Sequence, residues 1–407
     1  MKTITILNSM KSGYFMLVVC AILLLGATAC SSEEFGMEVP EVKKEWTKQE
    51  LIELALSQMA EMRDVKHPAQ MIAIKDTISI KCNASEEMTI VWEKGVENKT
   101  IVPANSNAVY THIYTDGKPS HYITIQGSMD ATLNLNVDNN RLIFLEVNAP
   151  YVTHLYCENN HLDSLDLAGG PILRELFADN NELSFLDVSQ ASMLMDLRAS
   201  HNRLKEIKLP QYSQSFYTLR LTDNRLKEID LTNNEILFFL HLEDNLITDL
   251  DLRGNPYLMD IYLNNLPLQT FNGVPVGAGD FSMYEGLSSV CLANTPFTSL
   301  DLSQNPFVMI IDISETSIST LDITNLNDLV CLYASYSELT NLEYISANLS
   351  KLRDVRIERT PWENKWEKTL EFISSLPDRK NTTPGTLYTY SLLMDSFVLP
   401  DNWIINP

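Results

Sequence analysis

The sequence has few glycines and prolines, and it is short of positive charge. Among 407 residues there are 14 glycines and 17 prolines, which excludes a collagen-like or low-complexity chain. The 30 lysines and arginines are outnumbered by 53 aspartates and glutamates, so the formal net charge is -23. Such a surface repels phosphate backbones and anionic lipid headgroups, so we expect no nucleic-acid partner and no peripheral binding to lipid. Hydrophobic residues make up 45% of the chain, which is enough for a core.

Cysteine is scarce as well, and the sequence lacks the common catalytic motifs. Six cysteines are present, and the four beyond residue 30 are far apart, without C-x-x-C spacing: Cys82, Cys157, Cys291 and Cys331. We interpret these four as small apolar side chains and not as a disulfide framework. There is no G-x-S-x-G, H-E-x-x-H or P-loop motif, and the seven histidines are dispersed. An enzyme is therefore not expected, and the sequence implies no metal and no cofactor.

The first thirty residues have the pattern of an export signal. Lys2 and Lys11 precede an apolar run from Tyr14 to Gly26, which is shorter than a comfortable membrane span. Small residues then lead to Cys30. The pattern predicts a signal peptide over residues 1–29 and a tether over residues 30–46. An ordinary secretory signal with a chance cysteine and a retained membrane helix are the alternatives.

The residues around Cys30 resemble a bacterial lipobox, Ala27-Thr28-Ala29-Cys30, although alanine stands at position 27 where leucine is usual. The resemblance implies that Cys30 is lipidated and anchors the chain to the bacterial outer membrane. The next residues, Ser31-Ser32-Glu33-Glu34, resemble a short acidic tag for export to the cell surface. We therefore expect a lipid-anchored, surface-exposed protein.

The body of the chain is a repeat of the form L-x-L-x-x-N-x-L-x-x-L-x-L, as in the segment 155–167. The asparagine falls at Asn140, Asn160, Asn181, Asn202, Asn224 and Asn245. In later units the same slot holds Leu266, Thr295, Thr316, Ser337 and Thr360. The longer step after Leu266 predicts a loop over residues 273–288, and leucine in the slot predicts an irregular coil before it. The asparagine side chains are expected to turn inward and satisfy backbone groups of their own and neighbouring coils.

This pattern resembles the leucine-rich repeat family, in its short bacterial form with about 21 residues per coil, and most closely the internalin-like and BspA-like surface proteins. The resemblance implies a β-rich repeat solenoid over residues 129–360. One coil buries about six aliphatic side chains worth roughly 2 kcal/mol each. Ordering its backbone and side chains costs on the order of 30 kcal/mol, so coils are stable only when stacked.

Both ends of the repeat array need caps. Residues 47–128 predict a helix from Thr47 to Met62, with Thr47 as N-cap and Glu50 three later, followed by strands at 71–82, 88–92, 108–114 and 121–126. Trp92 and the His112-x-Tyr114 pair resemble PKD-like, immunoglobulin-type modules, which implies a small β-sandwich. Residues 361–407 predict an αβ cap with a helix at 362–376 and strands at 386–390 and 403–405.

The outward residue between the paired leucines of each unit forms a column along the array, with rungs about 4.8 Å apart. By resemblance to the family, this column lines the concave side. We predict that it is the binding site for a protein or glycan ligand, because aromatic residues and arginine are enriched at interfaces. The site residues are Tyr156, Phe177, Arg198, Arg220, His241, Tyr262, Tyr333 and Arg356, and Cys291 and Asp312 stand between Tyr262 and Tyr333 in the same column.

Two features of this column are open to a second interpretation. Arg198 beside Arg220 invites an anionic group, unless Asp179, Asp196 and Glu243 neutralise the two arginines. The aromatic residues are alternatively a stacked ladder that only stiffens the sheet.

A second outward column is acidic, and it is expected on the convex side. It contains Asp166, Asp187, Asp230, Asp251, Asp301, Asp322 and Glu343. Solvated acids are the main interpretation, and a calcium ladder is the alternative. In function, we favour a binding protein used in adhesion or in host or nutrient interaction. A structural envelope scaffold without a soluble ligand is the alternative.

Overall fold

The computed structural model describes residues 46–47, 50–51, 54, 67–92, 98–148, 150–167, 170–211, 213–379, 383–389 and 400–406. The predicted signal peptide, Cys30 and nearly all of the tether lie outside the described residues. The chain divides into two units, residues 1–46 and 47–407, and every helix and strand described belongs to the second. In the described ranges, no helix has both the length and the apolar character needed to cross a bilayer.

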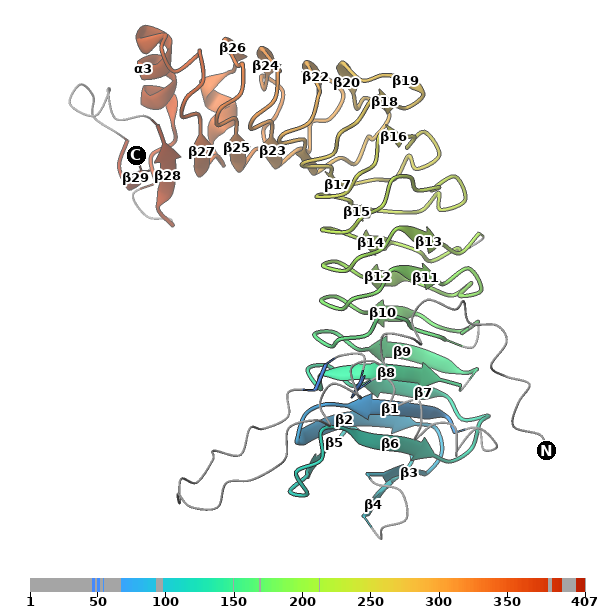
Figure 1. Cartoon of the computed structure of the whole chain (residues 1–407). Coiled ribbons are helices and arrows are strands. Elements are labelled where there is room, and N and C mark those ends of the chain that lie inside the picture. The colour runs from blue at the N-terminus through green and yellow to red at the C-terminus, as the bar shows by residue number, and fades with distance from the viewer. Residues whose placement is uncertain are drawn as a thin grey trace, which may run out of the picture. The chain divides into compact units, whose positions relative to one another are not determined.

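Short parallel strands stack one upon another to form most of a 15-stranded sheet, the main sheet (Figure 1). Each strand contributes one inward leucine or similar residue, and these residues pair across the ladder, as Leu176 does with Leu197. The prediction of a leucine-rich repeat solenoid is therefore confirmed. The parallel strands are β7 (Leu133–Asn136), β9 (Val152–Tyr156), β10 (Glu175–Phe177), β12 (Asp196–Arg198), β14 (Thr218–Arg220), β15 (Phe239–His241), β17 (Asp260–Tyr262), β21 (Ser289–Cys291), β23 (Ile310–Asp312), β25 (Cys331–Tyr333) and β27 (Asp354–Arg356).

The repeated asparagine holds neighbouring coils together. Asn181 Nδ2 donates to the carbonyl oxygens of Cys157 in the previous coil (2.9 Å) and Ala178 in its own coil (3.1 Å). Its Oδ1 accepts from the N–H of Leu162 at 3.1 Å. Thr316 in the same slot keeps one carbonyl contact, to Ile313 (2.6 Å). The predicted role of the asparagine slot is confirmed, and threonine performs part of it.

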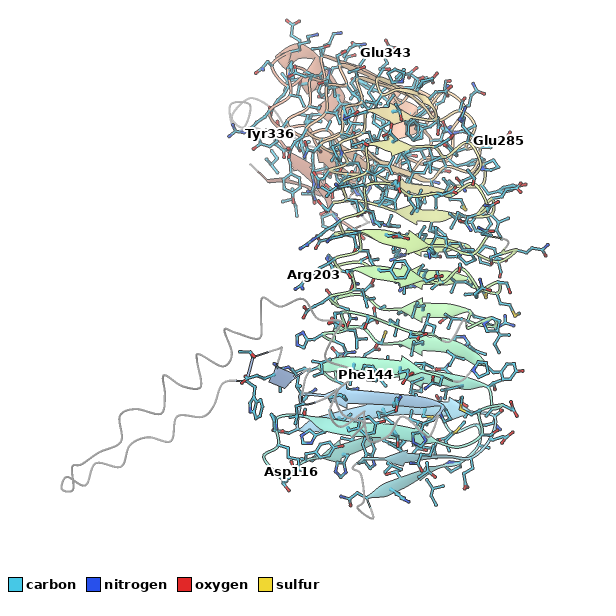
Figure 2. All side chains as sticks on the ribbon, turned by 45° about the vertical axis from the view of Figure 1, so that its right-hand side comes forward. Asp116, Phe144, Arg203, Glu285, Tyr336 and Glu343 are labelled. Carbon is cyan, nitrogen blue, oxygen red and sulfur yellow. The ribbon has the colours of Figure 1, made fainter. Side chains whose placement is uncertain are left out.

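The residue just before this slot has a positive φ in every coil, and here the chain uses little glycine. Asparagine or aspartate fills the position in most coils, because their short polar side chains tolerate the left-handed region. Later coils place larger residues there, including Tyr336 with φ 58°, which is exposed at the edge of the array (Figure 2). The positions with φ between 51° and 61° in the coils include Asn139, Asn159, Asn180, His201, Asp223, Asp244, Asn265, Asn294, Glu315 and Arg359.

The opposite side of each coil, the second face, carries shorter strands and the acidic column. Six aspartates of this face each accept a hydrogen bond from the backbone N–H two residues later, at 2.8–3.1 Å. These are Asp187, Asp230, Asp251, Asp280, Asp301 and Asp322, and all are exposed. The acids therefore close Asx turns, which explains aspartate after the leucine of the L-D-L segment. The strands are β11 (Phe185–Asp187), β13 (Glu206–Lys208), β16 (Asp249–Leu250), β18 (Thr270–Phe271), β20 (Ala278–Asp280), β22 (Ser299–Asp301), β24 (Thr320–Asp322) and β26 (Asn341–Glu343).

The predicted loop over residues 273–288 is more ordered than expected. β18 turns at Gly273 (φ 78°) into β19 (Val274–Pro275), its antiparallel partner, and β20 then pairs with β22. The coil that contains Leu266 is regular in the main sheet, where β17 pairs with β15 and β21. Leu266 is fully buried, so packing replaces the missing asparagine bonds there. The expected irregularity is confined to the second face.

Two sheets form the N-terminal end of the array. One has the order β4-β3-β6-β1-β8, and the other, β5-β2-β7, is the first part of the main sheet. Both sheets contribute side chains to the same buried cluster as the coils. Both also continue past residue 128 without a linker. The segment 71–82, expected as one strand, breaks into two at residues 74–76. The bounds are β1 (Ala69–Ala73), β2 (Thr77–Ala84), β3 (Met88–Val91), β4 (Lys99–Val102), β5 (Val109–Ile113), β6 (His121–Gln126) and β8 (Leu142–Val147).

The helix predicted before this sandwich is described only at a few residues. At its start, the N–H of Thr47 donates to Glu50 Oε2 at 2.9 Å, and the N–H of Glu50 donates to Thr47 Oγ1 at 3.2 Å. This reciprocal pair is the predicted capping box.

The C-terminal end is closed by helix α3 (Trp366–Ser375) and strands β28 (Gly385–Tyr388) and β29 (Trp403–Asn406). A short 3-10 helix, η1 (Ser346–Leu349), contacts α3. β28 and β29 extend the main sheet in parallel, so the predicted cap strands continue the ladder. Trp362 and Phe372 are buried against the last coils, with ring centroids 5.4 Å apart.

Candidate functional site

The eight predicted site residues stand in one column of the main sheet, which we call the stripe. Strand pairing places Tyr156 beside Phe177, then Arg198, Arg220, His241 and Tyr262 on successive rungs. Tyr333 and Arg356 follow after two rungs, and Tyr388 of β28 extends the column. All eight predicted residues are partly exposed, whereas Cys291, between Tyr262 and Asp312, is buried.

The side chains in the N-terminal half of the stripe contact their neighbours. Tyr156 packs edge-on against Phe177 with ring centroids 5.0 Å apart, and the Arg198 guanidinium lies 4.1 Å above the Phe177 ring. His241 and Tyr262 are stacked at 4.3 Å with an interplanar angle of 12°. Burial raises the pKa of Tyr262 to about 12, so its hydroxyl stays protonated at physiological pH. Ring contacts therefore join Tyr156 to Phe177 and His241 to Tyr262, and the two arginines stand on the rungs between these pairs.

The C-terminal half is organised around Arg356. Its guanidinium lies 4.6 Å from the centroid of the Tyr333 ring and 4.7 Å from that of Tyr388. Asp354 Oδ2 accepts a hydrogen bond from the Tyr333 hydroxyl at 3.0 Å and lies 3.7 Å from Arg356 Nη2. Burial is the main cause that raises the pKa of Tyr333, and the nearby Asp354 carboxylate adds to it. Cation–π contacts and an ion pair thus fix this arginine between two rings.

Beside the stripe, the main sheet has another outward column that was not predicted from the sequence. Its residues lie two positions before each stripe residue on the same strand. Asp196 of this column pairs with Arg198 through two hydrogen bonds, at 2.8 and 3.2 Å. Glu175, on the neighbouring rung, accepts a hydrogen bond from the hydroxyl group of Tyr156. A side chain and the one two residues later point to the same face of a strand, so this column was available from the period-2 rule. Its members are His154, Glu175, Asp196, Thr218, Phe239, Asp260, Ser289, Ile310, Cys331, Asp354 and Thr386.

The two adjacent arginines differ in their surroundings. Asp196 neutralises Arg198, which is the result expected under the second interpretation. Within the described part of the chain, the Arg220 side chain makes no ion pair and no hydrogen bond, and its Nε is a buried donor without an acceptor. Glu243 accepts the Thr222 hydroxyl at 2.9 Å and lies 3.5 Å from His241 Nδ1, so it is engaged elsewhere. Arg198 is thus neutralised by a direct ion pair, whereas Arg220 interacts with Asp179 only through its charge, which acts to lower the pKa of that carboxyl.

Three half-buried acids stand beside the N-terminal end of the stripe on consecutive coils: Asp138, Glu158 and Asp179. Burial is the largest cause that raises the pKa of each. The charges of Asp138 and Asp179 raise the pKa of Glu158 further. Asp138 Oδ1 and Asp179 Oδ1 accept hydrogen bonds from the N–H groups of Glu158 and Ser200 in the next coil, which partly offsets the effect of burial.

We expect Glu158→Gln to stabilise the protein at pH 7.5 and to have no such effect at pH 4. A carboxyl whose pKa is raised in the folded state favours folding below its unfolded pKa, and this contribution is lost as pH rises through the folded pKa. Glutamine carries no charge, so the variant does not lose stability at this position as pH rises. Urea denaturation at both pH values measures the difference. Glu235→Gln, at an exposed position, is the control; an equal effect of Glu158→Gln at both pH values would contradict the expectation.

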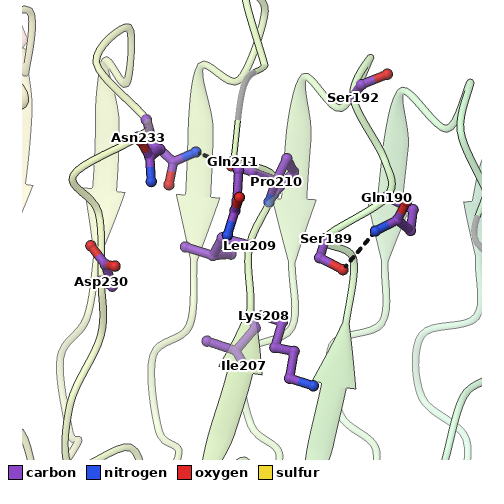
Figure 3. A pocket seen from close by; sticks show the side chains of 11 residues that line it. Ser189, Gln190, Ser192, Ile207, Lys208, Leu209, Pro210, Gln211, Asp230 and Asn233 are labelled. Atoms are coloured by element: carbon purple, nitrogen blue, oxygen red, sulfur yellow. Dashed lines mark hydrogen bonds between the residues drawn. The ribbon is translucent and has the colours of Figure 1, made fainter.

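A polar pocket of about 710 Å³ opens on the second face. Figure 3 shows Leu209, Pro210 and Gln211 in its middle, with Ser189 and Gln190 on one side and Asp230 and Asn233 on the other. Its charged lining side chains are Lys208 and Asp230, and Lys208 Nζ lies 3.6 Å from Asp187. The pocket lining therefore contains one cation, which is paired with Asp187, and no aromatic side chain.

The four cysteines beyond residue 30 are free and buried, as predicted. Across the described ranges, no group of three or more histidine, cysteine, aspartate or glutamate side chains is arranged to hold a metal ion. The stripe is therefore a surface of aromatic rings, arginines and carboxylates, which is suited to binding by hydrogen bonds, ion pairs and ring contacts.

The period of about 21 residues, the parallel main sheet and the asparagine ladder define the chain as a leucine-rich repeat solenoid. No protein-family model matches the chain, and no curated protein does either. Several solved structures are similar to it at low sequence identity.

The functional domain of InlJ from Listeria monocytogenes, which includes a cysteine ladder, is 23% identical over 63% of this chain, with a TM-score of 0.43. This chain covers 64% of the length of that domain. A leucine-rich repeat protein of Leptospira interrogans is 18% identical over 64% of this chain and 81% of its own, with a TM-score of 0.44. The internalin InlF from Listeria monocytogenes is 18% identical over 64% and 71%, with a TM-score of 0.46.

Proposed function

We propose that this chain is a binding protein displayed on the bacterial cell surface. A lipid on Cys30 would anchor it to the outer membrane, and the stripe would recognise a protein or glycan ligand. The observation that carries the proposal is the column itself, in which arginines and aromatic rings on successive strands are fixed by their neighbours and remain partly exposed. Rigid aromatic and arginine side chains contribute most of the energy at protein interfaces, and fixing them beforehand lowers the entropy lost on binding.

The test is a binding screen of the soluble form, residues 33–407, against glycans and surface proteins. For a ligand found in this way, replacing Arg198, Arg220 and Tyr262 together by alanine is expected to weaken binding about 100-fold or more, since each interface anchor contributes about 1–2 kcal/mol. Circular dichroism would show whether the variant is folded.

The matched control replaces two arginines and one tyrosine outside the stripe, namely Arg203, Arg253 and Tyr257. Tyr257 is 53% exposed, and the two arginines form ion pairs with Glu182 and Asp251. This variant should bind as the unchanged protein does. Equal affinity of both variants would remove the stripe as the site. A stable complex with other outer-membrane components and no soluble ligand would indicate an envelope scaffold.

A further inference from the structure

We propose that the stripe contains a carboxylate subsite at Arg220, and that it takes an acidic side chain of a protein ligand. This inference rests on the proposed binding function and specifies the chemistry of the ligand.

The first argument is a missing partner in a repeated pattern. Where an arginine follows an aspartate by two residues, the two pair: Arg198 with Asp196 at 2.8 Å and Arg356 with Asp354 at 3.7 Å in the main sheet. At the equivalent place beside Arg220, the strand has Thr218. At that level the two neighbouring rungs have Phe239 and Asp196, and Asp196 is the partner of Arg198. On its own strand, Arg220 thus has a hydroxyl where the other two arginines have a carboxylate.

The second argument is the state of Arg220 itself. Its Nε is buried without a hydrogen-bond acceptor among the described residues, as is the Nε of Arg356, and leaving such a donor unpaired costs about 1–3 kcal/mol. Two acids of the adjoining coils have other partners: Asp179 Oδ1 accepts from the Ser200 N–H, and Glu243 contacts Thr222 and His241. The charge of Arg220 acts to lower the pKa of Asp179, but no hydrogen bond joins the two side chains. Arg220 is partly exposed, and a carboxylate is the group that pairs with a guanidinium through two parallel bonds, so a ligand carboxylate would pair with the accessible part of this side chain.

The third argument concerns which carboxylate fits. Beside Thr218 and Phe239 lies an aromatic cluster in which Phe238 stacks on Tyr217 at 5.4 Å and meets Phe239 edge-on at 6.4 Å. An acidic side chain next to an apolar one matches this arrangement, as at a protein interface. His241 is stacked on Tyr262 and Arg198 lies over Phe177, so one face of each of these rings is not available to stack on a sugar ring. A polyanion would be repelled by a chain of net charge -23.

The test observes the Arg220 Nε–H directly. In the 15N–1H spectrum of the labelled soluble form, its signal is assigned by its loss in Arg220→Lys. Titration with N-acetylglutamate α-amide should shift this signal saturably, while the neutral N-acetylglutamine α-amide, at matched ionic strength, should not. Thr218→Asp places a carboxylate two residues before Arg220, as in the other pairs. It should shift the signal without ligand and weaken the titration at least tenfold, whereas the neutral Thr218→Asn should retain it.

Thr218 is buried, so Arg220→Gln provides a second variant that adds no charge to the interior. On N-acetylglutamate α-amide, this variant should lose the shifts of neighbouring backbone signals. No saturable shift in the unchanged protein, or an unaltered response in Arg220→Gln, overturns the subsite. Tighter binding of glucuronate than of N-acetylglutamate α-amide overturns the assignment to a protein side chain. The proposed function is judged separately, by the triple stripe variant against a ligand from the screen.

Discussion

Replacing Asn202 by alanine is expected to lower the free energy of unfolding by about 3 kcal/mol or more. Asn202 Nδ2 donates to the carbonyl oxygens of Ala178 at 2.9 Å and of Ala199 and Ser200 at 3.2 Å. Its Oδ1 accepts from the N–H of Leu183 at 3.0 Å. Alanine would leave the buried N–H of Leu183 without a partner, at a cost of about 1–3 kcal/mol. It would also remove one hydrogen bond from each of the three carbonyls, which keep bonds from Asn181 Nδ2, Asn224 Nδ2 and the Asn180 N–H, and each lost bond costs about 0.5–1.5 kcal/mol.

Urea denaturation followed by circular dichroism measures this loss. Asn202→Thr should give an intermediate result, because Thr316 in the equivalent slot keeps one of the carbonyl contacts. The matched control is Asn233→Ala, at an exposed position of the second face, which should change stability by less than about 0.5 kcal/mol. If Asn202→Ala were as mild as the control, the asparagine ladder would not be a source of stability.

The coils and the stripe could be predicted from the sequence because both follow the repeat period. The inward leucine and the slot of Asn202 recur at nearly constant spacing, and the spacing fixes the register of every strand in the main sheet. Once the register is known, the outward residue of each strand must fall in one column. The eight predicted residues were therefore placed correctly relative to one another, before any partner of their side chains was known.

The partners were not predictable in the same way, because they obey no repeat. The column of Asp196 and Thr218 changes residue type on every rung, so the partner of each stripe residue has to be worked out rung by rung and does not follow from the repeat. The hairpin of β18 and β19 arises from one insertion and has no second copy in the array. A further buried asparagine, Asn255, which donates to the carbonyls of Leu231 and Asn234, was also missed. Its signal was the recurring L-x-x-N segment, as in residues 252–255 and 302–305.

The C-terminal cap covers the apolar end of the last coil. Trp362, Phe372 and Ile373 are fully or almost fully buried, and Phe372 also packs edge-on against Tyr344 at 5.1 Å. Beyond them, β28 occupies the free edge of β27. The inward residues of the last coil, Val355 among them, are fully buried only because this cap is present.

Truncation after Thr360 is therefore expected to abolish soluble, cooperative folding. Three large buried side chains contribute roughly 2 kcal/mol each, and an uncovered strand edge pairs readily with other chains. Size-exclusion chromatography and thermal denaturation should show aggregation in place of a cooperative transition. The control removes one coil from the middle of the array: deletion of residues 219–239 joins Thr218 to Leu240 and leaves complete coils on both sides. Since each coil contacts only its neighbours, this internal deletion should remain folded. A folded truncation together with an unfolded internal deletion would contradict nearest-neighbour stacking as the basis of stability.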